Sequence, residues 1–295
     1  MTFRNAQYLV ETDWLEKHLD DSELRILDCT VYLPNYFDES AGTKIKVVPG
    51  REDYEKGHIP GSAYVDLVGE LTDRENKRFM FPMPPAGQFA EAMSRHGVGP
   101  GTSVVLYDRS VNIWATRVWW MMRAFGFHNA VVLNGGWKKW TIEGRPVSTE
   151  PPTYPRANFE AVLRPELIAT KEEVLAAIGD PETCIVNALD PDEYAGRGPV
   201  RYGRPGHIPS SVNVWCLSLV DPQTHAYLPA EKLREQFASV DALVKGRIIT
   251  YCGGAIAATS DAFVLTLLGA DSVAVYDGSM TEWAADPDLP LETGN

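Results

Sequence analysis

Short apolar segments alternate with longer helical patterns along the whole chain. In the first half, the segments that predict buried strands are Leu24–Asp28, Ser103–Tyr107 and Ala130–Leu133. In the second half, they are Cys184–Ala188, Arg247–Tyr251 and Ser272–Tyr276. Each half also has one longer apolar stretch, and these stretches predict the helices Ile113–Phe125 and Ile256–Leu268.

The second of these helices has a clear period. Its apolar residues recur at three- and four-residue steps, at Ile256, Phe263, Val264, Leu267 and Leu268, and Gly269 is placed to end the helix. The order strand, helix, strand predicts an α/β fold in which each mainly parallel sheet is flanked by helices. Ligands of such sheets bind beyond the carboxyl ends of the strands.

The chain contains an internal repeat. Three landmarks of the first half return in the same order in the second: GHIPGS at Gly57–Ser62 as GHIPSS at Gly206–Ser211, VVLYD at Val104–Asp108 as IITYC at Ile248–Cys252, and Gly135–Trp137 with Trp140 as Asp277–Ser279 with Trp283. Their offsets differ by only a few residues. Conserved order together with conserved spacing predicts two duplicated domains.

A proline-rich segment separates the two copies. It begins near Gly144 and contains Pro146, Pro151, Pro152, Pro155 and Pro165. Proline lacks a backbone donor and favours extended chain, so we expect this segment to run along the surface between two cores. We place the domains at residues 1–150 and 151–295.

Composition narrows the class of protein. The apolar fraction is 44% and the charged fraction 23%, which are globular proportions. With 27 Lys and Arg against 40 Asp and Glu, the net charge is −13. Such an acidic chain repels phosphate backbones and anionic lipid, so we expect neither a nucleic-acid nor a membrane partner. The acidic start of the chain does not resemble a secretory or organellar leader, and we expect a cytoplasmic protein with reduced thiols.

The four cysteines differ in their surroundings. No two of them have the spacing of a CxxC zinc or redox pair. Cys29 and Cys184 adjoin apolar strands and Cys216 follows no glycine loop, so structural roles are expected for these three. Cys252 follows a predicted strand and precedes Gly253, Gly254 and Ala255 and the helix from Ile256.

Small residues between a strand and a helix allow backbone N–H groups to converge on one point, and the helix N-terminus adds positive potential. We expect the segment Gly253–Ala257 to cradle an anion and to push the Cys252 thiol towards thiolate, which is the nucleophilic form. Cys252 is therefore the candidate catalytic residue, and the alternative is a buried structural thiol.

These features together resemble the two-domain rhodanese family of sulfurtransferases. The resemblance rests on the duplicated GHIP segments, the cysteine loop before a helix, Leu133–Trp137 (LNGGW), Tyr276–Ser279 (YDGS) and Glu282 with Trp283, and it covers nearly the whole chain. It implies that domain two is catalytic and that domain one is a degenerate copy, with Asp108 at the cysteine position.

The resemblance also implies a double-displacement reaction. Cys252 would take a sulfur atom from a small anionic donor, 3-mercaptopyruvate or thiosulfate, and become a persulfide. A thiophilic acceptor, cyanide or a thiol, would then remove that sulfur. No metal and no organic cofactor are expected.

The sequence departs from the family pattern at several positions. Ala255 stands where the cysteine loop usually has glycine, and a Cβ there resists a positive φ. Leu189 stands at the position of the family's substrate-gripping arginine, Asn187 at that of an aspartate and Val31 at that of a tryptophan near the site. The segment from Asp28 to Gly57 is longer than is usual in the family. Gly253 after the cysteine favours 3-mercaptopyruvate as the donor.

Replacement cations are expected near the GHIP segment of domain two. Arg197, Arg201 and Arg204 lie just before it, and we hypothesise that one or two of them bind the donor, the alternative being a solvated loop. His58 could relay a proton to a leaving group, although a histidine repeated in both copies is more typical of a hydrogen bond within a turn.

Two other function classes stay open. The missing arginine and loop glycine allow a non-catalytic rhodanese-like binding module, and a persulfide carrier would keep the chemistry but change the acceptor. A cysteine phosphatase of this topology needs an arginine six residues after the cysteine. That position is Ala258, which argues against phosphate chemistry.

Overall fold

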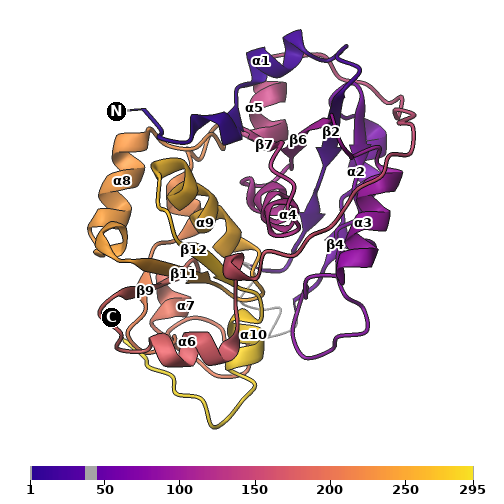
Figure 1. Cartoon of the computed structure of the whole chain (residues 1–295). Helices are drawn as coiled ribbons and strands as arrows, with labels where there is room; N and C mark the ends of the chain where they lie inside the picture. Colours follow the sequence, from indigo (N-terminus) through magenta and orange to yellow (C-terminus); the bar gives the residue numbers. More distant parts are fainter. Residues whose placement is uncertain (1, 37–44, 295) are drawn as a thin grey trace.

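Two parallel sheets of identical topology form the framework of the molecule (Figure 1). The computed structural model describes residues 2–36 and 45–294. The first sheet has the order β1-β7-β6-β2-β5, with strands β1 Leu9–Val10, β2 Leu24–Asp28, β5 Ser62–Tyr64, β6 Ser103–Tyr107 and β7 Ala130–Leu133. The second has the order β8-β12-β11-β9-β10, with strands β8 Ile168–Ala169, β9 Thr183–Asn187, β10 Val212–Asn213, β11 Arg247–Tyr251 and β12 Val273–Tyr276. The matching orders confirm the expected duplication and the α/β class.

Helices flank both sheets. Those of the first half are α1 Thr12–Lys17, α2 Arg51–Lys56, α3 Ala86–Arg95, α4 Ile113–Ala124 and α5 Gly136–Ile142. Those of the second half are α6 Lys171–Ala177, α7 Pro191–Tyr194, α8 Ala230–Ala238, α9 Ala257–Leu268 and α10 Ser279–Trp283. Short 3₁₀ turns lie at η1 Ala6–Tyr8, η3 Pro165–Leu167, η4 Cys216–Leu219 and η5 Ala242–Val244, and β3 Val31–Tyr32 pairs with β4 Val48–Pro49 in an antiparallel ribbon.

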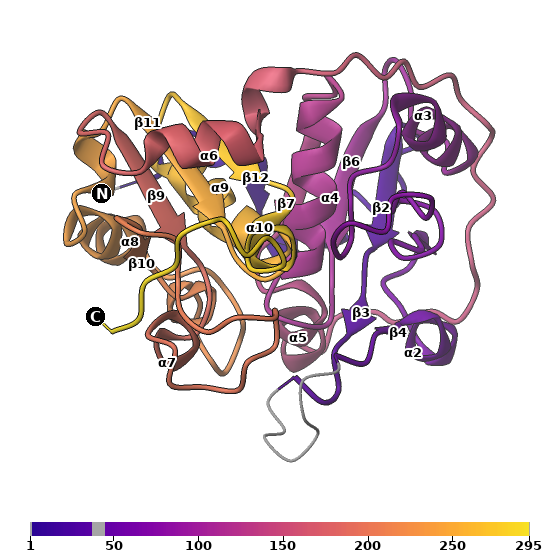
Figure 2. The same ribbon diagram turned by 90° about the horizontal axis from the view of Figure 1, so that it is seen from below.

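The helices α4 and α9 pack against each other between the two sheets (Figures 1 and 2). The Trp119 ring of α4 meets the Phe263 ring of α9 edge-on, with centroids 4.8 Å apart, and the hydroxyls of Thr116 and Thr259 lie 3.1 Å apart. The period of α9 predicts one apolar face, but every residue from Ala258 to Leu268 is buried. A helix between two domains is covered on all sides, which explains its apolar composition.

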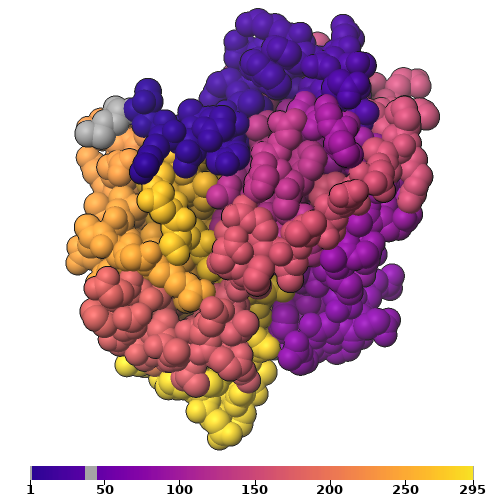
Figure 3. All heavy atoms as spheres, viewed as in Figure 1, coloured from indigo at the N-terminus to yellow at the C-terminus, as the bar shows by residue number. Residues whose placement is uncertain are grey.

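The segment between the copies runs along the surface of the first domain (Figures 1 and 3). It has no regular structure from Glu150 to Arg164 and is held by backbone bonds from Ala157 to Ser94 and from Val162 to Phe125, and by the buried ring of Phe159. The segment is therefore extended and lies on the surface, as its prolines predict.

The two GHIP segments have a structural role. The His58 ring stacks on Tyr54 with centroids 4.1 Å apart, and its Nδ1 lies 2.9 Å from the Tyr54 carbonyl. His207 repeats this arrangement on Tyr194, at 3.8 Å and 2.8 Å. The same turn contact in both copies agrees with the structural interpretation of these histidines.

Within the described residues, no helix combines the length and apolar character needed to cross a membrane.

Candidate active site

Cys252 lies directly after β11, at the carboxyl end of the second sheet. This residue is 2% exposed, and all four cysteines, each within the described residues, have free thiols. The loop that follows leads into α9, as the sequence predicts. The candidate nucleophile therefore stands at the strand-to-helix junction, where parallel sheets place their ligands.

Four backbone amides converge on the Cys252 sulfur. They belong to Gly254, Ile256, Ala257 and Ala258, and each lowers the pKa of the thiol. Burial is the larger effect, however, and it raises the pKa of Cys252 above its ordinary value. The expectation that the cradle keeps the resting cysteine ionised is therefore wrong. The loop provides donors for an anion, but the uncharged thiol is the form favoured at neutral pH.

The loop around the sulfur has a fixed shape. Ala255 adopts a φ of +58°, so this residue takes the left-handed conformation that its Cβ was expected to resist. Its amide donates to the Ser279 hydroxyl at 3.1 Å and does not join the cradle, and the Cys252 amide donates to the same hydroxyl at 3.2 Å. The Cys252 carbonyl accepts from Met280 at 3.0 Å. The start of α10 thus holds both ends of the loop.

The two glycines of the loop provide space. A Cβ at Gly253 would collide with the ring of Tyr202, and a Cβ at Gly254 would come within 3.2 Å of the Met80 Cβ. Gly253 therefore allows the Tyr202 ring to lie against the loop, which is a role outside the amide cradle.

The first domain contains the same loop with a carboxylate in place of the sulfur. The Asp108 carboxylate accepts the amides of Ser110, Asn112, Trp114 and Ala115 at 2.7, 3.1, 2.9 and 3.0 Å. Burial raises the pKa of Asp108 to about 6, while the amides lower it. The fold therefore builds an anion-binding loop twice, and in the first copy a side chain fills it. Asp108 occupies the cysteine position, as expected.

A cavity of about 400 Å³ opens in front of Cys252, between the two domains. The first domain contributes residues from the β3 region, Phe81, and the start of α4. The second contributes Ala188 to Asp190, Tyr202, η4 and the cysteine loop. Leu189 and Val31, which replace the family's arginine and tryptophan, both line it. Part of the unusually long segment from Asp28 to Gly57, residues 37–44, lies outside the described residues.

The three arginines expected to bind the donor do not line this cavity. Arg197 is paired with Asp192 on the surface. Arg204 donates to four backbone carbonyls, those of Trp283, Ala284, Asp286 and Leu289. Arg201, with a side chain only 5% exposed, binds Glu193 at 3.1 Å. Because each of these guanidinium groups already binds carboxylate or carbonyl partners, the hypothesis of a replacement arginine is not supported.

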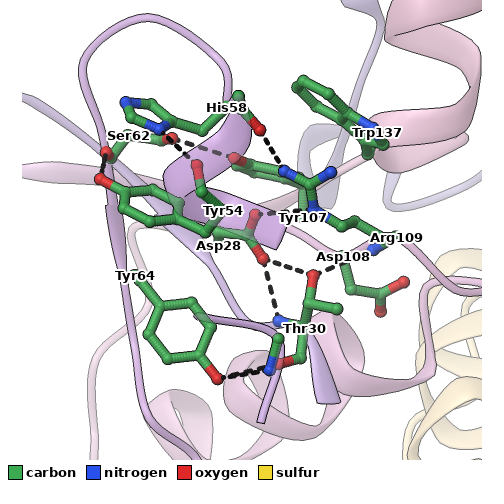
Figure 4. Close-up of polar contacts among 12 residues, drawn as sticks. Asp28, Thr30, Tyr54, His58, Ser62, Tyr64, Tyr107, Asp108, Arg109 and Trp137 are labelled. Carbon is green, nitrogen blue, oxygen red and sulfur yellow. Dashed lines mark hydrogen bonds and ion pairs between the residues drawn. The ribbon is translucent and has the colours of Figure 1, made fainter. Parts of the chain in front are cut away.

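His58 is also absent from the cavity lining. Figure 4 places it in a polar cluster of the first domain, with Tyr54 and Ser62, and its Nε2 lies 3.1 Å from the Glu150 carbonyl. The ring is fully buried. A proton relay from His58 to a bound donor therefore has no route through the described cavity.

Several residues of the site were missed by the sequence analysis. Cys216, expected to be structural, lines the cavity together with Cys252, and so does Trp114 from the tryptophan-rich helix. Tyr202 and Trp215 carry no motif of their own. Ser279 belongs to the repeat landmark Asp277–Ser279 and to the YDGS segment, but neither motif shows that its hydroxyl lies beside the Cys252 amide.

A buried ion pair joins the first domain to the support of the cysteine loop. The guanidinium of Arg117, on α4, contacts the Asp277 carboxylate at 2.7 Å, and the other carboxylate oxygen of Asp277 accepts the Met83 amide at 2.9 Å. Asp277 lies between β12 and α10, two residues before Ser279. The relative placement of the domains is thus coupled to the loop that surrounds Cys252.

Comparison with known proteins agrees with this geometry. Residues 11–143 and 170–286 match the Rhodanese-like domain. The chain is 31% identical over 306 residues to the thiosulfate/3-mercaptopyruvate sulfurtransferase 2 of Arabidopsis thaliana, which covers 96% of this chain and 86% of that protein. It is 31% identical over 309 residues to the sulfur carrier protein TtuD of Thermus thermophilus, which covers 100% of this chain and 99% of that protein.

Among solved structures, SseA from Escherichia coli, described as a 3-mercaptopyruvate sulfotransferase, superposes with a TM-score of 0.80 at 28% identity. The match covers 92% of this chain and 98% of SseA. Each matched segment contains four of the five strands of one sheet, and the resemblance seen in the sequence is confirmed: this chain belongs to the rhodanese-like family, with two such domains in tandem.

Proposed function

We propose that the protein is a sulfurtransferase that carries a sulfane sulfur on Cys252 as a persulfide. The observation that supports this most strongly is the loop of four amides around the Cys252 sulfur, which recurs in the first domain around the Asp108 carboxylate. A loop that holds a carboxylate in one copy suits a thiolate or persulfide anion in the other. The names of the Arabidopsis and Escherichia coli relatives point to the same chemistry.

The reaction has two displacement steps. In the first, the Cys252 thiolate attacks the outer sulfur of a donor, the bond between that sulfur and the donor breaks, and the leaving group keeps the bonding electrons. Thiosulfate would release sulfite, and 3-mercaptopyruvate would release the enolate of pyruvate. In the second, cyanide or a thiol attacks the outer sulfur of the persulfide, and Cys252 leaves as thiolate.

The amide loop contributes most when the sulfur is charged. Since burial raises the pKa of the resting thiol, the loop amides offset only part of the energy needed to form the thiolate. The persulfide ends on a sulfur one bond further into the cavity, and the same donors are within reach of its charge. We propose no metal and no organic cofactor, because each step needs only a sulfur nucleophile and a leaving group.

A sulfur carrier is the second candidate. The Thermus relative bears that name, and the cavity wall offers no lysine or arginine among the described residues that would bind a small free anion. A carrier would receive and deliver sulfur through protein or thiol partners, with the persulfide on the same cysteine. All four thiols are free, and we propose a reducing, cytoplasmic setting for either role.

Thiocyanate formation tests the proposal. The wild-type protein should convert cyanide to thiocyanate with at least one sulfane donor, and Cys252→Ser should abolish this turnover. Cys184→Ser is the matched control, because Cys184 is buried in β9 and does not line the cavity. Full turnover by Cys252→Ser would rule out the persulfide mechanism, and absence of turnover and of a persulfide in the wild type would indicate a binding module.

A further inference from the structure

Aliphatic and aromatic side chains form most of the wall of the cavity at Cys252. The first domain contributes Tyr32, Phe81 and Trp114, and the second contributes Tyr202 and Trp215. Aliphatic side chains fill the spaces between the rings, and they include Leu33, Ile113, Leu189, Leu217 and Ile256. A wall of this kind gains free energy by contact with an apolar molecule and gains nothing from a hydrated ion.

The polar groups next to the rings satisfy one another. The Tyr36 hydroxyl donates to the Glu193 carboxylate at 2.8 Å and lies 2.9 Å from the Tyr202 hydroxyl. Arg201 binds Glu193 and lies over the Tyr36 ring, 4.9 Å from its centroid. The positive charge of Arg201 is therefore neutralised by Glu193 and shielded by an aromatic ring.

The wall of the cavity carries a negative charge, which repels a doubly negative donor such as thiosulfate. Among the described residues that line the cavity, Asp190 alone has a charged side chain. Its carboxylate accepts the Asp192 amide at 2.8 Å and caps α7, so it is held in place. A doubly charged donor in the cavity would be repelled by Asp190 and would meet no compensating cation on the described wall.

The volume of the cavity also favours a larger, apolar ligand. About 400 Å³ lies within the range of roughly 300–1,000 Å³ that is typical of pockets for organic ligands. Thiosulfate is a small anion with few heavy atoms, so most of the apolar wall would stay in contact with water when it is bound. A donor with an aromatic or branched alkyl body would fill the space and bury the rings.

From this wall we infer that the preferred sulfur donor has a bulky apolar body joined to its sulfane sulfur, as in aromatic or branched alkyl persulfides and thiosulfonates. This inference rests on the proposed function. With a persulfide donor, the Cys252 thiolate attacks the outer sulfur, the sulfur–sulfur bond of the donor breaks, and the apolar thiol leaves as thiolate. With a thiosulfonate donor, the corresponding sulfinate leaves.

A matched pair of donors tests the inference. Benzenethiosulfonate and methanethiosulfonate have the same charge and the same reacting sulfur, and they differ only in the apolar body. We expect kcat/KM for the phenyl compound to exceed that for the methyl compound by about tenfold or more, because the ring is buried only in the first case. Thiosulfate should be the poorest of the three donors.

Two variants locate the effect in the cavity. Leu217→Ala removes apolar wall and should reduce the phenyl-to-methyl ratio several-fold, and Leu189→Arg should raise the rate with thiosulfate relative to the phenyl donor. Val244→Ala, at an exposed residue outside the cavity, should leave the ratio unchanged. The ratio compares two donors on one protein, so a partial loss of folded enzyme does not move it.

The outcomes separate the two proposals. Equal kcat/KM for the phenyl and methyl donors, or thiosulfate as the best donor, would overturn the apolar-donor inference and leave the sulfurtransferase in place. Failure of every donor to form a persulfide or thiocyanate would overturn the proposed function, and the inference with it.

Discussion

Burial controls the reactivity of Cys252 at the level of the single residue. Cys252 is 2% exposed, and burial raises the pKa of its thiol even though four amides act in the opposite direction. Because the folded-state pKa is raised, the thiolate forms only at alkaline pH in the resting protein. The loop amides that stabilise the thiolate would also bind any other anion in the site, so such an anion competes with the thiolate for them.

The rate of Cys252 alkylation by iodoacetamide should follow this pKa. We predict that it rises steadily from neutral to alkaline pH, with a midpoint above the ordinary value of 9.0. Peptide mapping is needed to separate Cys252 from Cys216, which lines the same cavity. A rate that is already constant at neutral pH would show that the amides outweigh burial.

Gly253 and Gly254 offer a second prediction at this scale. Gly253→Ala places a Cβ in the Tyr202 ring, which should displace the ring, lower kcat/KM by about tenfold or more and destabilise the protein by about 1–3 kcal/mol. Gly254→Ala meets Met80 at 3.2 Å, a contact that a small shift relieves. Similar losses for the two variants, measured by donor kinetics and thermal unfolding, would contradict the role assigned to Tyr202.

The sequence places Cys252, the candidate nucleophile, at a strand-to-helix junction, but it does not reveal the neighbours of that residue. Cys252 could be predicted because a strand, small residues and a helix follow one another along the chain. The failure at Arg197, Arg201 and Arg204 has a different origin, since sequence proximity to a site does not tell which direction a side chain takes. Arg201 and Arg204 are held by partners that no local pattern reveals.

At the scale of elements, the long buried strands were predictable and the short edge strands were not. β2, β6, β7 and β11 have the predicted bounds, and β9 differs by one residue at each end. β1, β5, β8 and β10 have only two or three residues, too few to show a hydrophobic pattern. They form because the neighbouring strand offers unpaired backbone groups, which is a tertiary effect.

An ion pair between Arg117 and Asp277 joins α4 to the loop after β12. Arg117 is fully buried, and its Nε and one terminal nitrogen have no hydrogen-bond partner among the described residues. Arg117→Ala would leave Asp277 without its cation, so we predict a loss of about 3–5 kcal/mol in the free energy of unfolding and a lower sulfur-transfer rate.

Arg156→Ala is the matched control for this prediction. Arg156 also pairs with a carboxylate, that of Glu91, but its side chain is 57% exposed, and its removal should change stability by less than about 1 kcal/mol. Equal shifts of the thermal midpoint in the two variants would mean that the buried pair does not hold the domains together.

At the scale of the whole molecule, the duplication explains why the site lies between the domains. Each copy directs its strand-to-helix loop towards the other, because α4 and α9 pack together and both helices begin at such a loop. The first copy fills its own loop with Asp108 and contributes only wall to the cavity, whereas the second provides the sulfur of the candidate nucleophile, Cys252. The repeat was visible in the sequence, but the apolar cavity that it encloses was not, since its wall combines residues from both halves.

Site-resolved mass spectrometry after incubation with a sulfane donor tests the central claim most directly. We predict that the peptide containing Cys252, and no other cysteine peptide, gains the mass of one sulfur atom, and that cyanide removes it with release of thiocyanate. The extra sulfur on Cys216 in place of Cys252, or no added sulfur with any donor while the protein still forms thiocyanate, would contradict it.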